Sequence, residues 1–135
     1  MSRLNILDAS AVLARFQEES GRELVDAALD SGPCCISAVN ACEVLTKLCE
    51  KDMPLEVAEA ALNKLELHIL SFDTEAATLA ASLRIRTKPI GASLGDRACL
   101  ALAERIALTG DTPVVYTAER AWTKIKWPFK VVAIR

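Results

Sequence analysis

Residues 113–122 read PVVYTAERAW, a stretch that joins a predicted strand to a predicted helix. The apolar run 114–116 is typical of a short buried strand, and the residues from Ala118 onward have helical spacing. Glu119 falls in the first turn of this helix, where a carboxylate offsets the positive end of the helix dipole. Taken alone it is a surface charge at a helix start, so any further role depends on which side chains the fold brings beside it.

Outward from this junction, the whole chain alternates short apolar runs with helical segments. The apolar runs predict strands at 4–7 (LNIL), 34–37 (CCIS), 67–72 (LHILSF), 112–117 (TPVVYT) and 129–134 (FKVVAI). Helical spacing predicts helices at 10–19, 22–31, 40–51, 55–66, 73–88, 93–108 and 118–125. Continuous apolar strands are typical of parallel sheets that are buried on both faces. The pattern therefore predicts one α/β domain over residues 1–135, a three-layer α/β/α sandwich around a parallel sheet.

The composition indicates a folded chain without a general attraction for polyanions. The 135 residues are 52% hydrophobic and 25% charged, which is typical of a chain that buries a continuous core. The formal net charge is −2, so binding to nucleic acid would depend on a local basic patch or on metal ions.

Cysteine and histidine usage excludes several kinds of site. The five cysteines contain no CxxC pair, and the single histidine, His68, has no partner at a ligand spacing, so a zinc site is not expected. We expect reduced thiols in a cytoplasmic protein. No apolar segment approaches the ~20 residues of a membrane span, and the N-terminal residues lack the apolar core of a secretion signal. We therefore expect a soluble protein without a cleaved leader.

Four carboxylates follow predicted strands or open predicted helices. Asp8 ends the first strand, and Glu43 lies in the first turn after the second strand. Asp96 lies in the first turn of the helix before the fourth strand, and Glu119 follows that strand. A helix packed antiparallel to a parallel strand begins at the carboxyl edge of the sheet, where ligands bind in such folds. The sequence therefore predicts that all four acids meet at one edge.

Each of these acids also has a purely structural interpretation. The segments NACE (40–43) and SLGD (93–96) resemble capping boxes. Asp8 is less easily explained this way, because it directly follows a buried strand, and a buried carboxylate is costly unless a cation or hydrogen bonds compensate it. Asp73 and Glu75 also follow a strand and open a helix. We expect them only to cap that helix, because the third strand would hold them too far from Asp8 to share an ion.

Four segments together resemble the motifs of PIN-domain proteins, and specifically of VapC-type toxin ribonucleases. They are LDASAVLA (7–14), ISAVNACEVLTKL (36–48), SLGDRACLALA (93–103) and VVYTAERAW (114–122). The resemblance covers nearly the whole chain and implies a five-stranded parallel sheet in the order 3-2-1-4-5, with helices on both faces. It also implies Mg²⁺- or Mn²⁺-dependent hydrolysis of RNA by a homodimer, the toxin of a type II toxin–antitoxin (VapBC) system, paired with a small VapB-like antitoxin.

The resemblance assigns candidate site residues position by position. The residues that match the three central acids are Asp8, Glu43 and Asp96. Glu119 stands where the family most often has aspartate, and its extra methylene would shift a metal or a water. Thr117 matches the hydroxyl residue before this acid, and Ser10 matches a small hydroxyl residue after the first acid. Each hydroxyl either hydrogen-bonds a water in the site or caps a helix.

Phosphodiester hydrolysis needs an activated water and a way to offset charge on the phosphate oxygens, and a bound Mg²⁺ can supply both. This ion prefers oxygen ligands and keeps several waters. Asp8 and Asp96 are the expected direct ligands. Glu43 either binds the ion or orients and deprotonates the attacking water, and Glu119 holds a water ligand of the ion or a second ion. Without metal, such acids would raise one another's pKa.

Positive charge around the acids is expected to receive RNA. Arg97 lies beside Asp96, and Arg120 lies beside Glu119. Further basic candidates are Arg84, Arg86, Lys88, Lys124 and Lys126. Gly95 would let a phosphate approach the helix start closely. The helices after the first and second strands are expected to form a groove, lined by Leu, Ala and Val, that receives an antitoxin helix.

Other interpretations stay open at the level of the sequence. A PIN-fold RNA-processing nuclease, or a catalytically weak PIN module that binds RNA or protein, would share these motifs. A phosphoacceptor receiver domain is also a small parallel α/β fold, and it would use Asp8, Asp73 and Thr117. It requires two acids after the first strand, where this chain has DAS, and a lysine at the end of the fifth strand, whereas Lys130 lies near its start.

Overall fold

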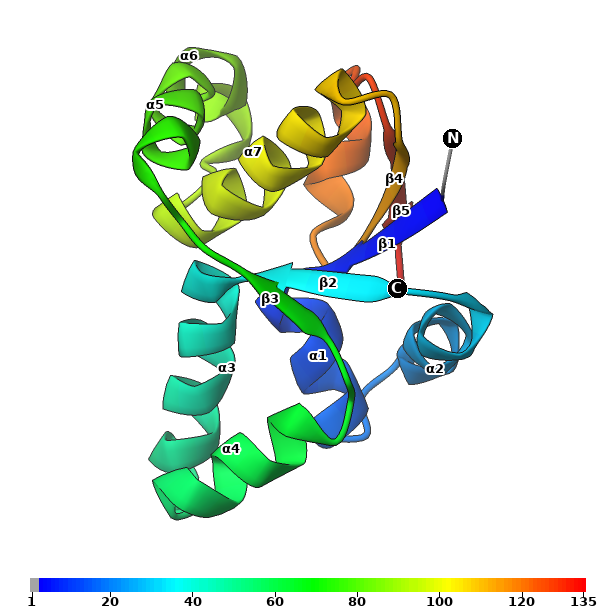
Figure 1. Ribbon diagram of the computed structural model, residues 1–135, viewed down its shortest axis with the longest axis vertical. Coiled ribbons are helices and arrows are strands. Elements are labelled where there is room, and N and C mark those ends of the chain that lie inside the picture. The colour runs from blue at the N-terminus through cyan, green and yellow to red at the C-terminus, as the bar shows by residue number, and fades with distance from the viewer. Residues whose placement is uncertain (1–2) are drawn as a thin grey trace.

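The computed structural model describes residues 3–135 and contains a five-stranded sheet in which all neighbouring strands are parallel. The strands are β1 (Arg3–Leu7), β2 (Cys34–Ser37), β3 (His68–Leu70), β4 (Thr112–Thr117) and β5 (Lys130–Ala133). Their spatial order is β3-β2-β1-β4-β5 (Figure 1). The predicted direction and order of the strands are therefore confirmed.

Helices cover both faces of the sheet (Figure 1). One face carries α1 (Ala9–Phe16), α2 (Arg22–Ser31), α3 (Ala38–Glu50) and α4 (Leu55–Asn63). The other face carries α5 (Thr74–Ser82), α6 (Arg84–Thr87), α7 (Leu94–Leu108) and the short 3₁₀ helices η1 (Lys88–Ile90) and η2 (Arg120–Lys124). This confirms the three-layer α/β/α arrangement.

Most side chains of the central strands are apolar, because alternate positions enter two different cores. Leu7 packs with α1 to α4, whereas its neighbour Ile6 packs with α5, α7 and η2, and both are fully buried. Tyr116 and Val115 divide between the same two cores on β4. Full burial of an Ile, Leu or Val side chain contributes about 1.5–3 kcal/mol, so these residues fix the strands in the middle of the sheet.

The carboxyl ends of β1 and β4 lie side by side at the point where the strand order reverses. Leu7 is paired with Tyr116 in the parallel register, and the Asp8 N–H donates to the Tyr116 carbonyl at 3.2 Å. The chain leaves β1 for β2 on one side, and β4 lies on the other. Such a reversal leaves a crevice outside the strand ends, where ligands bind in open α/β sheets.

Several helices begin or end a few residues from the sequence prediction, and local hydrogen bonds explain two of these differences. α3 begins at Ala38, because the Ser37 hydroxyl accepts from the Val39 N–H and caps it. The capping box predicted at NACE is therefore wrong. The predicted helix 73–88 breaks at Leu83, whose N–H donates to the Ala80 carbonyl three residues back and tightens the turn.

Further findings concern the last helix, the cysteines and the length of the helices. The segment after β4 forms the 3₁₀ helix η2 and not an α-helix over 118–125. All five cysteines are free thiols, as expected. No helix within residues 3–135 has the length and apolar character needed to cross a membrane.

Candidate functional site

A pocket of about 270 Å³ opens at the carboxyl edge of the sheet. Its lining comes from the end of β1 and α1, from α3, from the first turn of α7 and from the segment after β4. The lining residues are Asp8, Ala9, Ser10, Leu13, Asn40, Glu43, Lys47, Asp96 and Glu119. The fold thus brings together the four carboxylates singled out in the sequence, although they lie far apart along the chain.

Asp8 is the most enclosed of the four carboxylates, with 4% of its surface exposed. Its Oδ1 accepts hydrogen bonds from the Ser10 hydroxyl at 2.7 Å and the Ala11 N–H at 2.8 Å, and its Oδ2 accepts from the Thr117 hydroxyl at 2.6 Å. Asp8 therefore caps α1, a place that the sequence assigned to Ser10. Since Oδ2 has a single donor, it keeps a free lone pair for a further ligand.

Burial raises the pKa of Asp8 from 3.8 to about 6. The hydrogen bonds from Thr117, Ser10 and Ala11 lower this pKa but do not offset the loss of water, and the charge of Asp96 raises it further. Asp8 and Asp96 therefore repel each other across the pocket, as expected for acids that share a site without a cation.

Thr117 and Ser10 connect the ends of β1 and β4 through their hydroxyl groups. Thr117 is fully buried; it donates to Asp8 and accepts from the Glu119 N–H at 2.9 Å. Ser10 donates to Asp8 and accepts from the Ala118 N–H at 2.8 Å. Both hydroxyls thus orient the Asp8 carboxylate and the backbone that carries Glu119.

Glu43 reaches the pocket from α3 and contacts the first turn of α7. α3 begins at Ala38, so Glu43 lies in its second turn and not in the first turn predicted from the sequence. The Asn40 side-chain amide donates to Glu43 Oε1 at 2.8 Å and to the Gly95 carbonyl at 3.0 Å. The space beside Gly95, expected to admit a phosphate, is filled by the Glu43 carboxylate.

Asp96 combines a capping role with a place in the pocket. Its N–H donates to the Ser93 hydroxyl at 3.2 Å, and its Oδ2 accepts from the Ser93 N–H at 3.0 Å. This is the capping box predicted at SLGD, which is confirmed. The capping contact uses Oδ2, so Oδ1 stays available to a ligand in the pocket.

Glu119 is exposed at the pocket mouth. It stands at the N-cap position of η2, but its side chain makes no capping hydrogen bond. Its backbone N–H donates to the Thr117 hydroxyl. Glu119 therefore makes no capping hydrogen bond to η2, and its interpretation as a charge at the helix start stays open.

The two arginines expected to meet substrate do not line the pocket. Arg97 points to the other side of α7 and donates to the Ala80 carbonyl at 3.1 Å, so it ties the last turn of α5 to α7. Arg120 is exposed at the start of η2. The basic side chain that does line the pocket is Lys47, one turn after Glu43 on α3, and its ammonium lies 3.5 Å from Glu50.

The donor set in the pocket fits Mg²⁺ or Mn²⁺ in chemical type. All four acids offer oxygen atoms, and Mg²⁺ is commonly bound by one or two carboxylates while it keeps several waters. Within residues 3–135, no three acid, thiol or imidazole side chains converge closely enough to surround an ion. The carboxylates of the pocket could thus hold an ion only together with several waters.

Cys99 lies in the core beside the pocket and is fully buried. Burial raises the pKa of its thiol well above the usual value, and the charge of Asp8 raises it further. Because reactivity requires the thiolate, Cys99 is an inert part of the core and does not supply a nucleophile.

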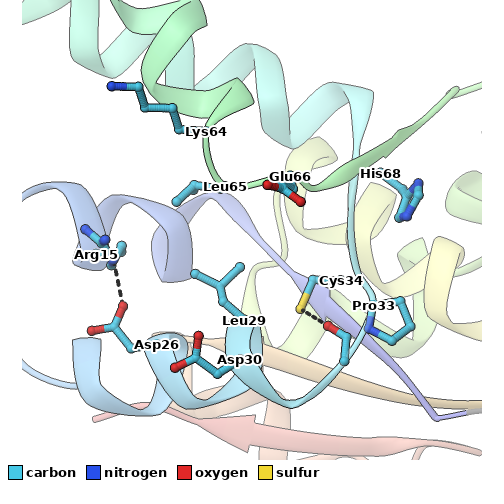
Figure 2. A pocket seen from close by; sticks show the side chains of 11 residues that line it. Arg15, Asp26, Leu29, Asp30, Pro33, Cys34, Lys64, Leu65, Glu66 and His68 are labelled. Atoms are coloured by element: carbon cyan, nitrogen blue, oxygen red, sulfur yellow. Dashed lines mark hydrogen bonds and ion pairs between the residues drawn. The ribbon is translucent and has the colours of Figure 1, made fainter.

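A second hollow, of about 660 Å³, lies at the opposite edge of the sheet, where β2 and β3 begin (Figure 2). Arg15 from α1 and Asp26 from α2 form an ion pair at 2.6 Å on one side, and Lys64 and Glu66 lie on the turn after α4. Its lining is mainly polar and charged, which differs from the expected groove of Leu, Ala and Val. An apolar hollow lies instead on α3 and α4, around Leu45 and Leu55.

The fold agrees with comparisons to known proteins. Residues 6–128 match the PIN domain. The chain therefore belongs to the PIN domain family. None of the curated protein sequences compared with the chain matches it.

Several solved structures share the fold. The DNA-bound VapBC of Salmonella typhimurium is 20% identical, with 98% of each chain covered and a TM-score of 0.67. VapBC-1 of nontypeable Haemophilus influenzae is 14% identical, with 97% of this chain and 98% of that chain covered and a TM-score of 0.68. VapBC2 of Rickettsia felis, bound to a promoter DNA fragment, is 13% identical over 96% and 97%, with a TM-score of 0.67. These similarities show the shared fold.

Asn40 is the site residue that the sequence did not identify. It was interpreted only as part of a capping box, yet it is 1% exposed and joins α3 to α7. Its Oδ1 is buried without a hydrogen-bond partner in the described part of the chain. An unpaired buried acceptor costs about 1–3 kcal/mol, so a polar residue at this position needs an explanation.

Proposed function

We propose that this protein is a Mg²⁺- or Mn²⁺-dependent ribonuclease of the VapC type, the toxin of a type II toxin–antitoxin system. The observation that carries the proposal is the convergence of Asp8, Glu43, Asp96 and Glu119 on one pocket at the carboxyl edge of a PIN fold. Four carboxylates with a single ammonium leave an excess of negative charge, and a divalent cation is the ligand that would offset it.

The chain's own residues divide the proposed reaction between them. Asp8 and Asp96 would hold the ion. Glu43 would hold a water ligand of the ion, orient this water toward the phosphorus and accept its proton. Glu119, which is exposed and has no side-chain partner within residues 3–135, binds a water at the pocket mouth. The bound ion would make that attacking water more acidic and offset charge on the phosphate oxygens.

Two basic segments that lie side by side support an RNA substrate. Arg86 lies over the Trp127 ring at 4.6 Å, so the segment 84–88 meets the segment 124–127. These segments carry Arg84, Lys88, Lys124 and Lys126 on the surface, in a chain whose net charge is −2. We propose that they contact the RNA backbone, since phosphate contacts supply most of the sequence-independent affinity for nucleic acids.

Cleavage of RNA by the purified chain tests the activity. With Mg²⁺ or Mn²⁺, the wild type should cleave, and chelation should stop it. Asp8→Asn should slow cleavage by about 100-fold or more, because several kcal/mol of transition-state stabilisation depend on the ion. Glu119→Ala should cost about 10-fold, as for a residue that orients water.

Chelator-insensitive cleavage, or an unchanged rate in Asp8→Asn, would contradict the proposal. A full rate in Glu119→Ala would make that residue only a surface charge. RNA binding without cleavage by the wild type would favour the binding-only alternative.

The toxin role also implies protein partners, an antitoxin and a second copy of the chain. We propose that a helix of the antitoxin occupies the apolar hollow around Leu45 and Leu55 on α3 and α4, because an amphipathic helix lays its apolar face into such a groove. Size-exclusion chromatography with light scattering should show a dimer for the chain alone. Where a neighbouring reading frame encodes a small protein, the two proteins together should form a larger complex. A monomer that forms no complex with this protein would favour an RNA-processing nuclease.

A further inference from the structure

Asn40 is held in one orientation by the two groups it contacts. Its amide nitrogen lies 2.8 Å from Glu43 Oε1 and 3.0 Å from the Gly95 carbonyl oxygen. Both neighbours are acceptors, so the nitrogen must face them and Oδ1 must face away. This leaves Oδ1 buried and unpaired. The protein therefore keeps an unpaired acceptor in order to place two donors between α3 and α7.

Gly95 provides the space into which the Glu43 carboxylate fits. A Cβ at residue 95 would collide with both Glu43 carboxylate oxygens and would lie 2.6 Å from its Cδ. Gly95 has no left-handed backbone angle that would require glycine. The missing side chain thus serves the contact with Glu43 and not the shape of the backbone.

We propose that Asn40 and Gly95 form a clamp that fixes the Glu43 carboxylate beside Asp96, with Asn40 as a positioning residue of the acidic site. This inference rests on the proposed metal site. Glu43 is exposed and has three rotatable side-chain bonds, so without the clamp its carboxylate would sample positions far from the pocket. Two features of the clamp hold the Glu43 carboxylate. One is the hydrogen bond from Asn40 on α3, and the other is the space that the missing side chain of Gly95 leaves on α7.

Mn²⁺ binding to the purified chain, followed by the electron paramagnetic resonance of free Mn²⁺, tests the clamp without RNA. Asn40→Ala should weaken Mn²⁺ binding by about 10-fold, within the range found when partners of metal ligands are removed. Gly95→Ala should do the same, because the methyl group displaces Glu43. Alanine favours helices more than glycine, so this variant should keep α7 folded. Asn63→Ala, an exposed asparagine at the end of α4, is the matched control and should bind as the wild type does.

A double-mutant cycle with Glu43→Gln separates positioning from a general structural effect. If Asn40 acts through Glu43, Asn40→Ala should cost little in the Glu43→Gln background, because the two changes remove the same interaction. An equal loss in both backgrounds would overturn the inference, as would wild-type Mn²⁺ affinity in Gly95→Ala. Clamp-dependent Mn²⁺ binding without RNA cleavage would support the clamp and contradict the proposed function. A wild type that binds no Mn²⁺ would overturn both.

Discussion

Asp8 carries a charge that the metal-free fold tolerates poorly. Burial raises its pKa to about 6, against 3.8 for the exposed group. An acid whose pKa is raised by folding contributes stability below its ordinary pKa, and this contribution is lost as the pH rises through the folded value. At about 1.4 kcal/mol per pKa unit, ionisation of Asp8 should cost the metal-free protein about 3 kcal/mol above pH ~6.

Asp8→Asn should therefore raise the free energy of unfolding of the metal-free protein at neutral pH, although it removes the proposed activity. Urea unfolding in the presence of a chelator, measured from about pH 4 to pH 8, should show wild type and variant alike at the acidic end. Above pH ~6 the variant should be more stable by about 3 kcal/mol. Asp30→Asn, on the exposed side of α2, controls for the substitution itself. If the free energy of unfolding changed with pH in the same way for wild type and Asp8→Asn, the charge on Asp8 would not be destabilising.

Individual contacts at this site were only partly predictable from the sequence. Asp8 was identifiable because a carboxylate directly after a buried strand is costly unless something compensates it. Asn40 was not, because its two acceptors lie on Glu43 and on Gly95, and the second is distant in sequence. Its spacing to Glu43 indicated a cap, but Ser37 caps α3 three residues earlier. The residue that caps α3 depends on where β2 ends, and local spacing does not determine this end.

Two helix starts allow capping to be separated from a role in the acidic site. Asp73 caps α5 by accepting from the Ala76 N–H at 2.9 Å, and Arg105 donates to both of its carboxylate oxygens. Asp96 is the third helical residue of the α7 capping box, in which Ser93 is the N-cap, and it also lines the pocket. Both acids offset the positive end of a helix dipole, so their local structural roles are comparable.

Asp73→Ala should lower the melting temperature but leave cleavage and Mn²⁺ binding unchanged. Asp96→Asn should keep the melting temperature close to that of the wild type, because the amide oxygen can still accept from the Ser93 N–H. It should reduce cleavage by about 100-fold or more, because a ligand of the ion is lost. Thermal unfolding and RNA cleavage measured on the same preparations check both. Equal loss of activity in the two variants would mean that Asp96 acts only as a cap.

At the level of elements, the parallel sheet was predictable and the helix boundaries were less so. Continuous apolar strands indicated burial on both faces, and Ile6 and Leu7 do enter different cores. The sequence did not predict the break at Leu83. The Ala80 carbonyl accepts from the Leu83 N–H at this break, and it also accepts from Arg97 on α7, which is a tertiary contact. Tertiary contacts of this kind override a helical pattern that is locally continuous.

Across the whole molecule, the acidic pocket joins segments that fold from distant parts of the chain. Asp8 and Glu119 follow paired strands, and Glu43 and Asp96 come from helices on opposite faces of the sheet. Their mutual repulsion works against the arrangement that brings them together. A cation held in the pocket would attract these carboxylates and offset their repulsion. Because only the folded chain brings them together, the cation would bind the folded state and not the unfolded state.

Mg²⁺ or Mn²⁺ should therefore raise the melting temperature. At 100 times its dissociation constant, an ion that binds only the folded state adds about 2.7 kcal/mol, which corresponds to roughly 5–10 °C for a domain of this size. The shift should grow from about pH 5 to pH 8, because Asp8 must lose its proton before it binds metal. Sodium chloride at matched ionic strength controls for screening, and Asp8→Asn should abolish the shift. The same shift with sodium chloride, or in Asp8→Asn, would show that general screening and not an ion in the pocket stabilises the fold.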